Sequence, residues 1–241
     1  MLEARNLAYR YGKQHSWLFN DLDLRITPGE IVGLSGPSGR GKSTLAKLLA
    51  GYLPPGRGSV MVDGRPLPES GHCPVQLLFQ HPELAVNPRW KAGDILAEAG
   101  PPDAALLRDL GIEPSWLARY PHELSGGELQ RICLVRALAP RTRYLLCDEM
   151  TSMLDALTQA SIWRTVLDIA RSRELGLLVI SHDQALLGKL CHRTVCYFQS
   201  DHRSSACFPA AKPSFVRKAF PVRRDSPAAR TDTWAPPPPP A

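Results

Sequence analysis

Residues 36 to 43 read Gly-Pro-Ser-Gly-Arg-Gly-Lys-Ser and fit the phosphate-binding pattern G-x-x-x-x-G-K-[ST]. A short apolar run, Ile31 to Leu34, precedes this loop, and Lys42 to Ala50 reads as a helix that stops at Gly51. A strand, a glycine-rich loop and a helix in this order form the context in which the pattern binds phosphate. The stretch therefore predicts an α/β fold built on a phosphate-loop NTPase core.

The residues of this loop have separate tasks in binding a nucleotide. Glycines let backbone N–H groups curl around an anion, and the helix that follows points the positive end of its dipole at it. Lys42 is expected to reach the β and γ phosphates of ATP, and the Ser43 hydroxyl to ligate Mg²⁺. The candidate nucleotide-binding residues of the loop are Gly36, Pro37, Ser38, Gly39, Arg40, Gly41, Lys42, Ser43 and Thr44.

An acidic pair, Asp148 and Glu149, follows the apolar run Tyr144 to Cys147. A carboxylate at the end of such a strand emerges at the carboxyl edge of the sheet, so Asp148 is expected to hold Mg²⁺. Glu149 faces elsewhere and can polarise a water for attack on the γ-phosphate. The alternative interpretation is that the acidic pair lies in a solvated turn. The presence of a phosphate loop in the same chain favours the catalytic interpretation.

Between the loop and the acidic pair, residues 124 to 131 read Leu-Ser-Gly-Gly-Glu-Leu-Gln-Arg. In this order the three motifs resemble the nucleotide-binding subunit of ATP-binding-cassette (ABC) transporters, over roughly residues 1 to 200. The resemblance implies that Ser125, Gly126 and Gly127 face the γ-phosphate bound by an opposite subunit, and that Asp155 crosses the dimer interface. ATP would thus be sandwiched between two chains, and a monomer would be nearly inactive.

The resemblance also assigns residues outside the three motifs. Gln80 matches the family's glutamine that senses Mg²⁺ and the γ-phosphate, which makes Ser43, Gln80 and Asp148 the candidate metal residues. His182 matches the histidine that contacts the γ-phosphate. Tyr11 matches the aromatic residue that stacks on adenine, although Tyr9 lies two positions away, where packing into the core suits it better. Glu149, His182 and Gln80 are the candidate catalytic residues.

The chain divides by composition into a folded part and a tail. Residues 1–199 are expected to form the ATPase domain, with an N-terminal antiparallel β subdomain and a helical insertion at about residues 85–140. Residues 200–241 are rich in proline and carry a net charge of +4 out of the +6 of the whole chain, so we expect a disordered or extended basic tail. Since the rest is nearly neutral, no specific nucleic-acid partner is expected.

Residues 79 to 89, Phe-Gln-His-Pro-Glu-Leu-Ala-Val-Asn-Pro-Arg, are similar to a segment of the importers of peptides and of nickel or metal chelates. In such systems an ATPase pairs with an identical or different ATPase beneath two transmembrane permease subunits, and an extracytoplasmic binding protein delivers the ligand. No apolar run approaches the roughly 18 residues of a membrane span, and the N-terminus does not read as a secretory signal. A peripheral place on the cytoplasmic face of the cell membrane is expected.

Two positions depart from the family pattern, since Glu128 replaces the common Gln and Met150 the common Pro. Neither removes a required functional group, so ATP hydrolysis is expected to survive. Two alternatives stay open: a regulatory half of an asymmetric ABC heterodimer that binds ATP with little or no turnover, and a soluble ABC ATPase acting on ribosomes or DNA. A single phosphate loop and signature argue against the second. The six cysteines show no zinc-type spacing and read as small buried residues.

Overall fold

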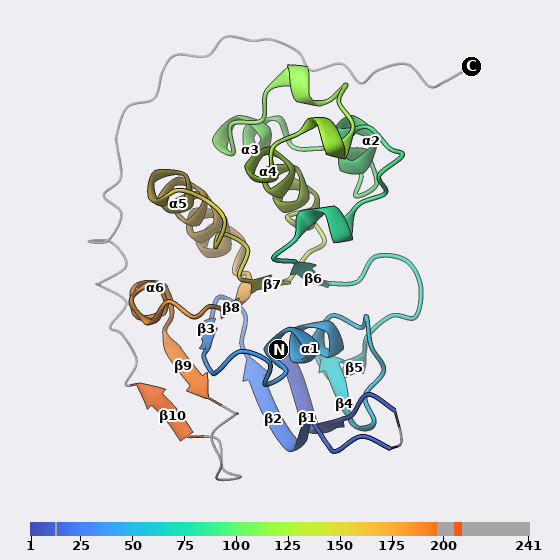
Figure 1. Ribbon diagram of the computed structural model, residues 1–241, viewed down its shortest axis with the longest axis vertical. Coiled ribbons are helices and arrows are strands. Elements are labelled where there is room, and N and C mark those ends of the chain that lie inside the picture. The colour runs from blue at the N-terminus through green and yellow to red at the C-terminus, as the bar shows by residue number, and fades with distance from the viewer. Residues whose placement is uncertain (13, 197–204, 209–241) are drawn as a thin grey trace.

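Two β-sheets and the helices around them make up the fold seen in a computed structural model of the 241-residue chain (Figure 1). The structure describes residues 1–12, 14–196 and 205–208, with the last segment described as backbone alone. Residues 200–204 and 209–241 of the predicted tail lie outside the described residues. Among the residues that the structure describes, no helix is long and apolar enough to cross a membrane.

The first sheet is antiparallel and lies at the N-terminal end, with the strand order β2-β1-β4-β5. Buried and exposed residues alternate along much of β2, as in a sheet with one face on the core and the other in solvent. Its strands are β1 (Leu2–Tyr9), β2 (Phe19–Ile26), β4 (Arg57–Val62) and β5 (Arg65–Pro66).

The second sheet has the order β10-β9-β3-β8-β7-β6 and is parallel except for β10 at its edge. Every residue of β3, β7 and β8 is buried, because layers of structure cover both faces of these central strands. The strands are β3 (Ile31–Leu34), β6 (Val75–Leu78), β7 (Tyr144–Asp148), β8 (Gly176–Ile180), β9 (Arg193–Cys196) and β10 (Ser205–Phe208). The sheet thus extends past residue 199, where the sequence places the end of the domain.

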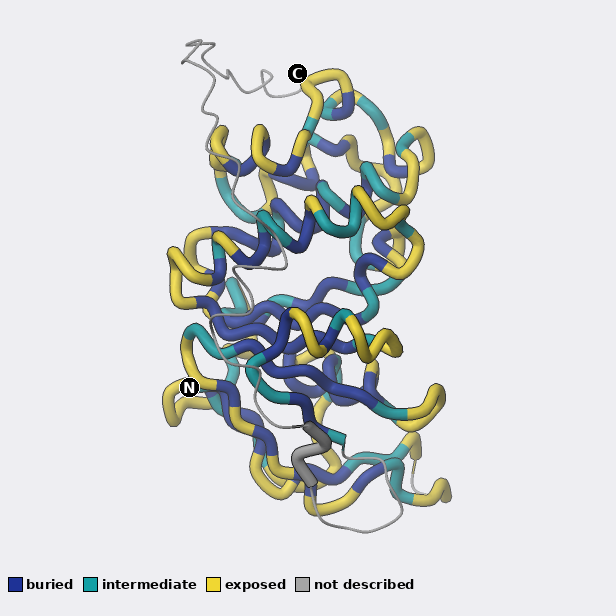
Figure 2. The backbone as a smooth tube through the Cα atoms, turned by 90° about the vertical axis from the view of Figure 1, so that its left-hand side faces the viewer, coloured by how far each residue is buried: buried dark blue, intermediate teal, exposed yellow. Residues whose placement is uncertain are grey.

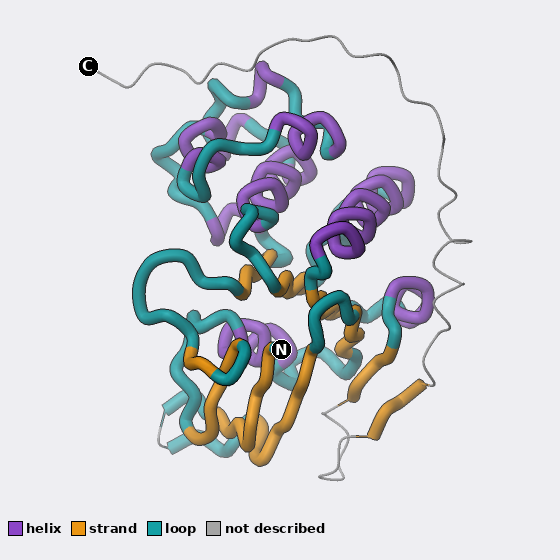
Figure 3. Tube along the Cα trace, turned by 180° about the vertical axis from the view of Figure 1, so that it is seen from behind, coloured by secondary structure: helices purple, strands orange, loops and turns teal. Residues whose placement is uncertain are grey.

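Helix α1 (Lys42–Leu49) lies between the two sheets, as Figures 1 and 3 show from opposite sides. Its leucines join one core cluster with β1, β2 and one face of the parallel sheet. The other face packs in a second cluster against α4, α5 and α6, and Figure 2 shows the buried residues concentrated through these layers. The remaining helical elements are η1 (Pro82–Ala85), α2 (Ala92–Ala97), α3 (Ala104–Asp109), η2 (Pro114–Trp116), η3 (Pro121–Glu123), α4 (Gly126–Ala137), α5 (Ala156–Arg173) and α6 (Gln184–Leu190).

The strand register brings three chain segments to one edge of the parallel sheet. Leu34 of β3 and Asp148 of β7 both pair with Ile180 of β8. The loops that leave these strands therefore begin side by side at the carboxyl ends, where open α/β sheets bind their ligands. Between β6 and β7 the chain is helical, and this part stands away from the antiparallel sheet (Figure 1).

Candidate nucleotide-binding site

A pocket of about 420 Å³ lies at this edge of the parallel sheet. That volume falls within the roughly 300–1,000 Å³ typical of small-molecule sites. Its lining comes from the loop before α1, from α1 itself, and from the segments that follow β1, β6, β7 and β8. The lining residues are Tyr11, Leu18, Ser38, Gly39, Gly41, Lys42, Ser43, Thr44, Gln80, Glu149 and His182.

The N-terminus of α1 opens onto this pocket without a side-chain cap. Its N-cap is Gly41 in the left-handed conformation, with φ of 94° and no capping hydrogen bond from a side chain. A Cβ at this position would come within 2.6 Å of Leu18, so only glycine fits the approach between the two residues. The first N–H groups of α1 are therefore available to an anion.

The Lys42 ammonium group is held against the phosphate loop. The residue is 6% exposed, and its Nζ donates to the carbonyl oxygens of Gly36 at 2.8 Å and Pro37 at 3.0 Å. These two bonds use two of the three N–H donors of an ammonium group. Lys42 thus supplies a preorganised positive charge beside the open end of α1, and Gly36 and Pro37 contribute by fixing it.

Ser43 and Asp148 bring oxygen atoms together from α1 and the end of β7. The Ser43 hydroxyl hydrogen-bonds the Asp148 carboxyl group, which is buried. Burial raises the pKa of Asp148 above its ordinary value; the Ser43 hydrogen bond opposes this, and the neighbouring Glu149 adds to it. A cation near Asp148 would offset the cost of burying its charge.

Glu149 and His182 meet across the ends of β7 and β8. Oε1 of Glu149 lies 2.7 Å from Nε2 of His182, which also lies 3.4 Å from the Ser38 hydroxyl oxygen. Glu149 adopts a left-handed backbone with φ of 50°, which is uncommon for a residue other than glycine. The backbone after β7 therefore turns at Glu149, and its carboxylate lies against His182 of the neighbouring segment.

Tyr11 and Gln80 line the pocket from two segments that are far apart in the sequence. The Tyr11 hydroxyl hydrogen-bonds that of Thr44 at 2.7 Å, and the residue is 53% exposed. Tyr9 packs edge-on against Tyr11 with ring centroids 5.0 Å apart, and also touches the core of the antiparallel sheet. This geometry favours Tyr11 over Tyr9 as the residue that would stack on adenine. Gln80 lines the pocket two residues after the end of β6.

The signature residues form a second, separate structure at the start of α4. Ser125 caps this helix by accepting from the Glu128 N–H at 3.3 Å, and Glu128 accepts from the Ser125 N–H at 2.7 Å. Asp155 caps α5 in the same manner, accepting from the N–H groups of Leu157 and Thr158. Of the predicted site residues, Ser125, Gly126, Gly127 and Asp155 lie on these other helix starts, outside the pocket that holds Lys42. Gly36, Pro37 and Asp148 do not line it either, but they hydrogen-bond Lys42 or Ser43, which do.

A family profile described as ABC transporter matches residues 19–152. The nickel import ATP-binding protein NikE of Rhodospirillum rubrum is 36% identical over 198 residues, which cover 74% of this chain and 71% of that protein. The chain belongs to the ABC transporter family. A putative peptide import ATP-binding protein of Brucella abortus is 35% identical over 199 residues, covering 73% of this chain and 59% of that one.

Solved ABC structures share the fold. A dimeric ATP-binding cassette in a post-hydrolysis state, bound to ADP and Pi, matches with a TM-score of 0.72 at 22% identity. The match covers 86% of this chain and 99% of that one. The predicted α/β class, with its phosphate-loop core and N-terminal antiparallel sheet, is thereby confirmed.

The residues of this ABC chain fit an ATP phosphate chain with its Mg²⁺. The open end of α1 and the buried Lys42 ammonium suit phosphate oxygens, and the Ser43 and Asp148 oxygens are the hard ligands that Mg²⁺ prefers. Among the described residues no cluster of three or more His, Cys, Asp or Glu side chains could hold a metal ion alone.

The sequence missed one pocket residue and included one that the structure leaves at the periphery. Leu18 lines the pocket and sets the space at Gly41, and no motif of ABC proteins indicates it. Arg40 is exposed at the turn of the phosphate loop and does not line the pocket. Three of the described cysteines, Cys133, Cys147 and Cys191, are buried as expected, whereas Cys73 and Cys196 are half-buried, and no disulfide joins any of these five.

Proposed function

We propose that this chain is the ATP-hydrolysing subunit of an ABC importer, working as a pair with a second ATPase subunit on the cytoplasmic face of the cell membrane. One observation carries the proposal: Lys42, Glu149 and His182 share a pocket, whereas the signature residues cap α4 outside it. A signature that acts on phosphate must then act on a nucleotide held by another chain. The dimeric cassette that shares this fold supports the same arrangement.

In the proposed reaction a water molecule attacks the γ-phosphorus of ATP, and the bond from that phosphorus to the β–γ bridging oxygen breaks. Glu149 accepts the proton of the attacking water. His182, whose Nε2 lies against that carboxylate in the structure, would donate to a γ-phosphate oxygen when ATP is bound. Lys42 and the α1 N–H groups stabilise negative charge on the phosphates. Ser43, Asp148 and Gln80 would hold Mg²⁺, which neutralises charge on the β and γ oxygens when bound. The products are ADP and phosphate.

The transported ligand is proposed to be nickel or a metal chelate, with a peptide as the second candidate. Support comes from relatives at about 35% identity, which are named as nickel import and putative peptide import ATP-binding proteins. The partners would be two transmembrane permease subunits and, through them, an extracytoplasmic binding protein. The segment that leads from Gln80 to Trp90 leaves Leu84 73% exposed and Trp90 41% exposed, as a permease contact would require.

Affinity purification of the tagged Glu149→Gln protein with ATP from detergent-solubilised cells tests the assembly, with partners identified by mass spectrometry. Two permeases and an ATPase partner are expected. The matched variant Glu149→Gln with Ser125→Arg should still bind ATP yet lose the partner ATPase, because an arginine would block the phosphate face of α4. Recovery of ribosomal or DNA-associated proteins instead would favour a soluble ABC ATPase and contradict the proposal.

Uptake assays in a strain that lacks this chain decide between the two ligands. Loss of radiolabelled nickel uptake with normal uptake of a labelled dipeptide is expected, and restoration by the wild-type chain but not by Lys42→Ala shows that the ATPase is responsible. Loss of dipeptide uptake alone would reverse the assignment of the ligand and leave the importer assignment intact.

A further inference from the structure

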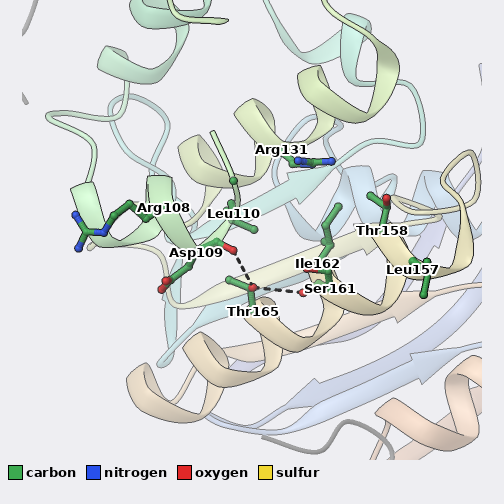
Figure 4. A pocket seen from close by; sticks show the side chains of 10 residues that line it. Arg108, Asp109, Leu110, Arg131, Leu157, Thr158, Ser161, Ile162 and Thr165 are labelled. Carbon is green, nitrogen blue, oxygen red and sulfur yellow. Dashed lines mark hydrogen bonds between the residues drawn. The ribbon is translucent and has the colours of Figure 1, made fainter. Parts of the chain in front are cut away.

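A second cleft, of about 370 Å³, lies between α5 and the turn that follows α3. Figure 4 shows the side chains of α5 on one side and Arg131 of α4 entering from the other. Thr165 ties the two sides together, since its hydroxyl donates to the backbone carbonyl of Asp109 at 3.4 Å. The cleft is separate from the nucleotide pocket, because the two share no lining residue.

The cleft combines an apolar floor with a guanidinium group. Leu110 and Ile162 line it with 4% and 3% exposure, and they belong to the packed core. Arg131 is half-buried above them with its guanidinium 5.6 Å from the Trp116 ring centroid. Its Nε is buried and has no hydrogen-bond partner among the described residues. A buried donor without a partner lowers the stability of the fold. An anionic group that accepted a hydrogen bond from this nitrogen would remove that cost.

The rim of the cleft limits what that anion can be. Arg108 and Asp109 stand at the rim with opposite charges, and Figure 4 shows the Arg108 side chain pointing away from the other lining residues. Figure 4 also shows the Asp109 carboxylate directed away from Arg131, so the charge that faces the cleft is that of Arg131, which suits a monoanion. Ser161 adds an exposed hydroxyl, and the volume lies at the lower end of the roughly 300–1,000 Å³ of ligand sites.

We propose that this cleft binds a small organic carboxylate with an apolar body. The carboxylate pairs with the Arg131 guanidinium, which presents its donors in the planar fork that matches two carboxylate oxygens. The apolar body lies on Leu110 and Ile162, and the Ser161 hydroxyl donates at the open side. A ligand of this kind spans α5 and the helical segment that carries α3 and α4.

Saturation-transfer NMR on the full chain tests the binding site, with sodium benzoate as the probe and benzamide as its uncharged counterpart. Benzoate is expected to bind with a Kd of about 1 mM, and benzamide about tenfold more weakly because it lacks the charge. Arg131→Met keeps the apolar stem and should weaken benzoate about tenfold. Arg171→Met removes an exposed arginine from the far end of α5 and is the matched control, expected to leave benzoate binding unchanged.

Two further variants keep the outcome decisive. Ser161→Phe fills the cleft from an exposed position, so it should abolish benzoate binding even where Arg131→Met fails to fold. Lys42→Ala should keep benzoate binding, which separates this cleft from the nucleotide pocket. No detectable benzoate binding, equal binding of benzamide, or unchanged binding in Ser161→Phe would each overturn the proposal. Because the assay needs no ATP turnover, its failure is distinct from failure of the proposed function.

Discussion

The helices α1 and α4 both begin at glycine-rich motifs, yet their first turns are built differently. Helix α1 starts at a left-handed Gly41 with no side-chain cap, and its free N–H groups face a pocket that also holds Lys42. Helix α4 starts at Ser125, whose capping box with Glu128 satisfies the backbone N–H groups of these two residues from within the chain. An uncapped N-terminus leaves its N–H groups to water or to an external anion, whereas a capping box satisfies some of them within the chain.

This contrast separates the two halves of an ABC site within one chain. The α1 half collects the groups that we propose bind and cleave a nucleotide. The α4 half keeps its shape without one, and it can therefore be presented to the nucleotide of another subunit. The same kind of substitution, made at the start of each helix, should therefore affect the two helices differently.

The largest contrast is expected between two carboxylates, each replaced by its amide. Glu149→Gln should lower ATP turnover by about 10²- to 10⁴-fold, because the amide cannot accept the proton of the attacking water. Glu128→Gln should stay within about threefold of the wild type, because the amide oxygen still accepts from the Ser125 N–H. Steady-state phosphate release measures both. Wild-type turnover in Glu149→Gln would remove this residue from the role of general base and place the chemistry elsewhere.

The second-largest effect is expected when the positive charge of Lys42 is removed. Lys42→Ala should weaken ATP binding by about 100-fold, which corresponds to about 2.7 kcal/mol and to hydrogen bonds made by a charged group. Equilibrium binding of a fluorescent ATP analogue measures it, and Lys189→Ala on the exposed surface of α6 serves as the control. Tight binding in Lys42→Ala would show that the open end of α1 is not where the phosphates lie.

A pair of Gly→Ala substitutions compares the backbone conformation at the two helix starts. Gly41→Ala should lower the free energy of unfolding by about 2 kcal/mol, because φ is 94° and the added Cβ would meet Leu18 at 2.6 Å. Gly126→Ala should leave stability unchanged or slightly higher, since no atom lies within 4 Å and alanine favours the helix. Urea denaturation measures both variants.

The activity of Gly126→Ala then reports on the second subunit. Turnover should fall about tenfold, because the methyl group would stand where α4 meets a nucleotide held by another chain. Wild-type turnover together with wild-type stability would mean that nothing approaches this end of α4, and the division into two halves would fail.

Local patterns in the sequence account for much of the architecture and for the choice of pocket residues. The phosphate loop, the buried strand before Asp148 and the helical spacing after Glu128 each lie within a dozen residues, where periodicity and turn chemistry are decisive. The apolar run at residues 31–34 coincides with β3 for this reason. Each of these features predicts an element that the structure contains.

What the sequence does not show are contacts between segments far apart in the chain. The approach of Leu18 to Gly41 and the pairing of Glu149 with His182 depend on strand register, which no local pattern states. Strand β10 falls in the predicted tail because an edge strand is defined by its partner, here β9. The start of helix α5 at Ala156 is also hard to read from the sequence, because Asp155 caps a first turn with little apolar periodicity.

The smallest effect is expected when the capping box at the start of α4 is removed. Glu128→Ala should lower the free energy of unfolding by about 1 kcal/mol at neutral pH, because the Ser125 N–H loses its acceptor. The Ser125 hydrogen bond holds the pKa of Glu128 below its ordinary value of 4.5. The stabilisation by the ionised carboxylate is therefore present above pH 4.5 and is lost as the pH falls through the lower pKa of the folded state.

The difference in stability between the wild type and Glu128→Ala should accordingly narrow below pH 4.5, as urea denaturation across pH can show. Glu123→Ala is the matched control, because Glu123 accepts from the Tyr120 N–H at 2.7 Å in the capping box of η3. Both variants should lose some stability, but only Glu128→Ala should also weaken ATP-dependent pairing with a second subunit. Equal pairing in the two variants would reduce the α4 cap to a local stabilising feature, unrelated to the presentation of the signature.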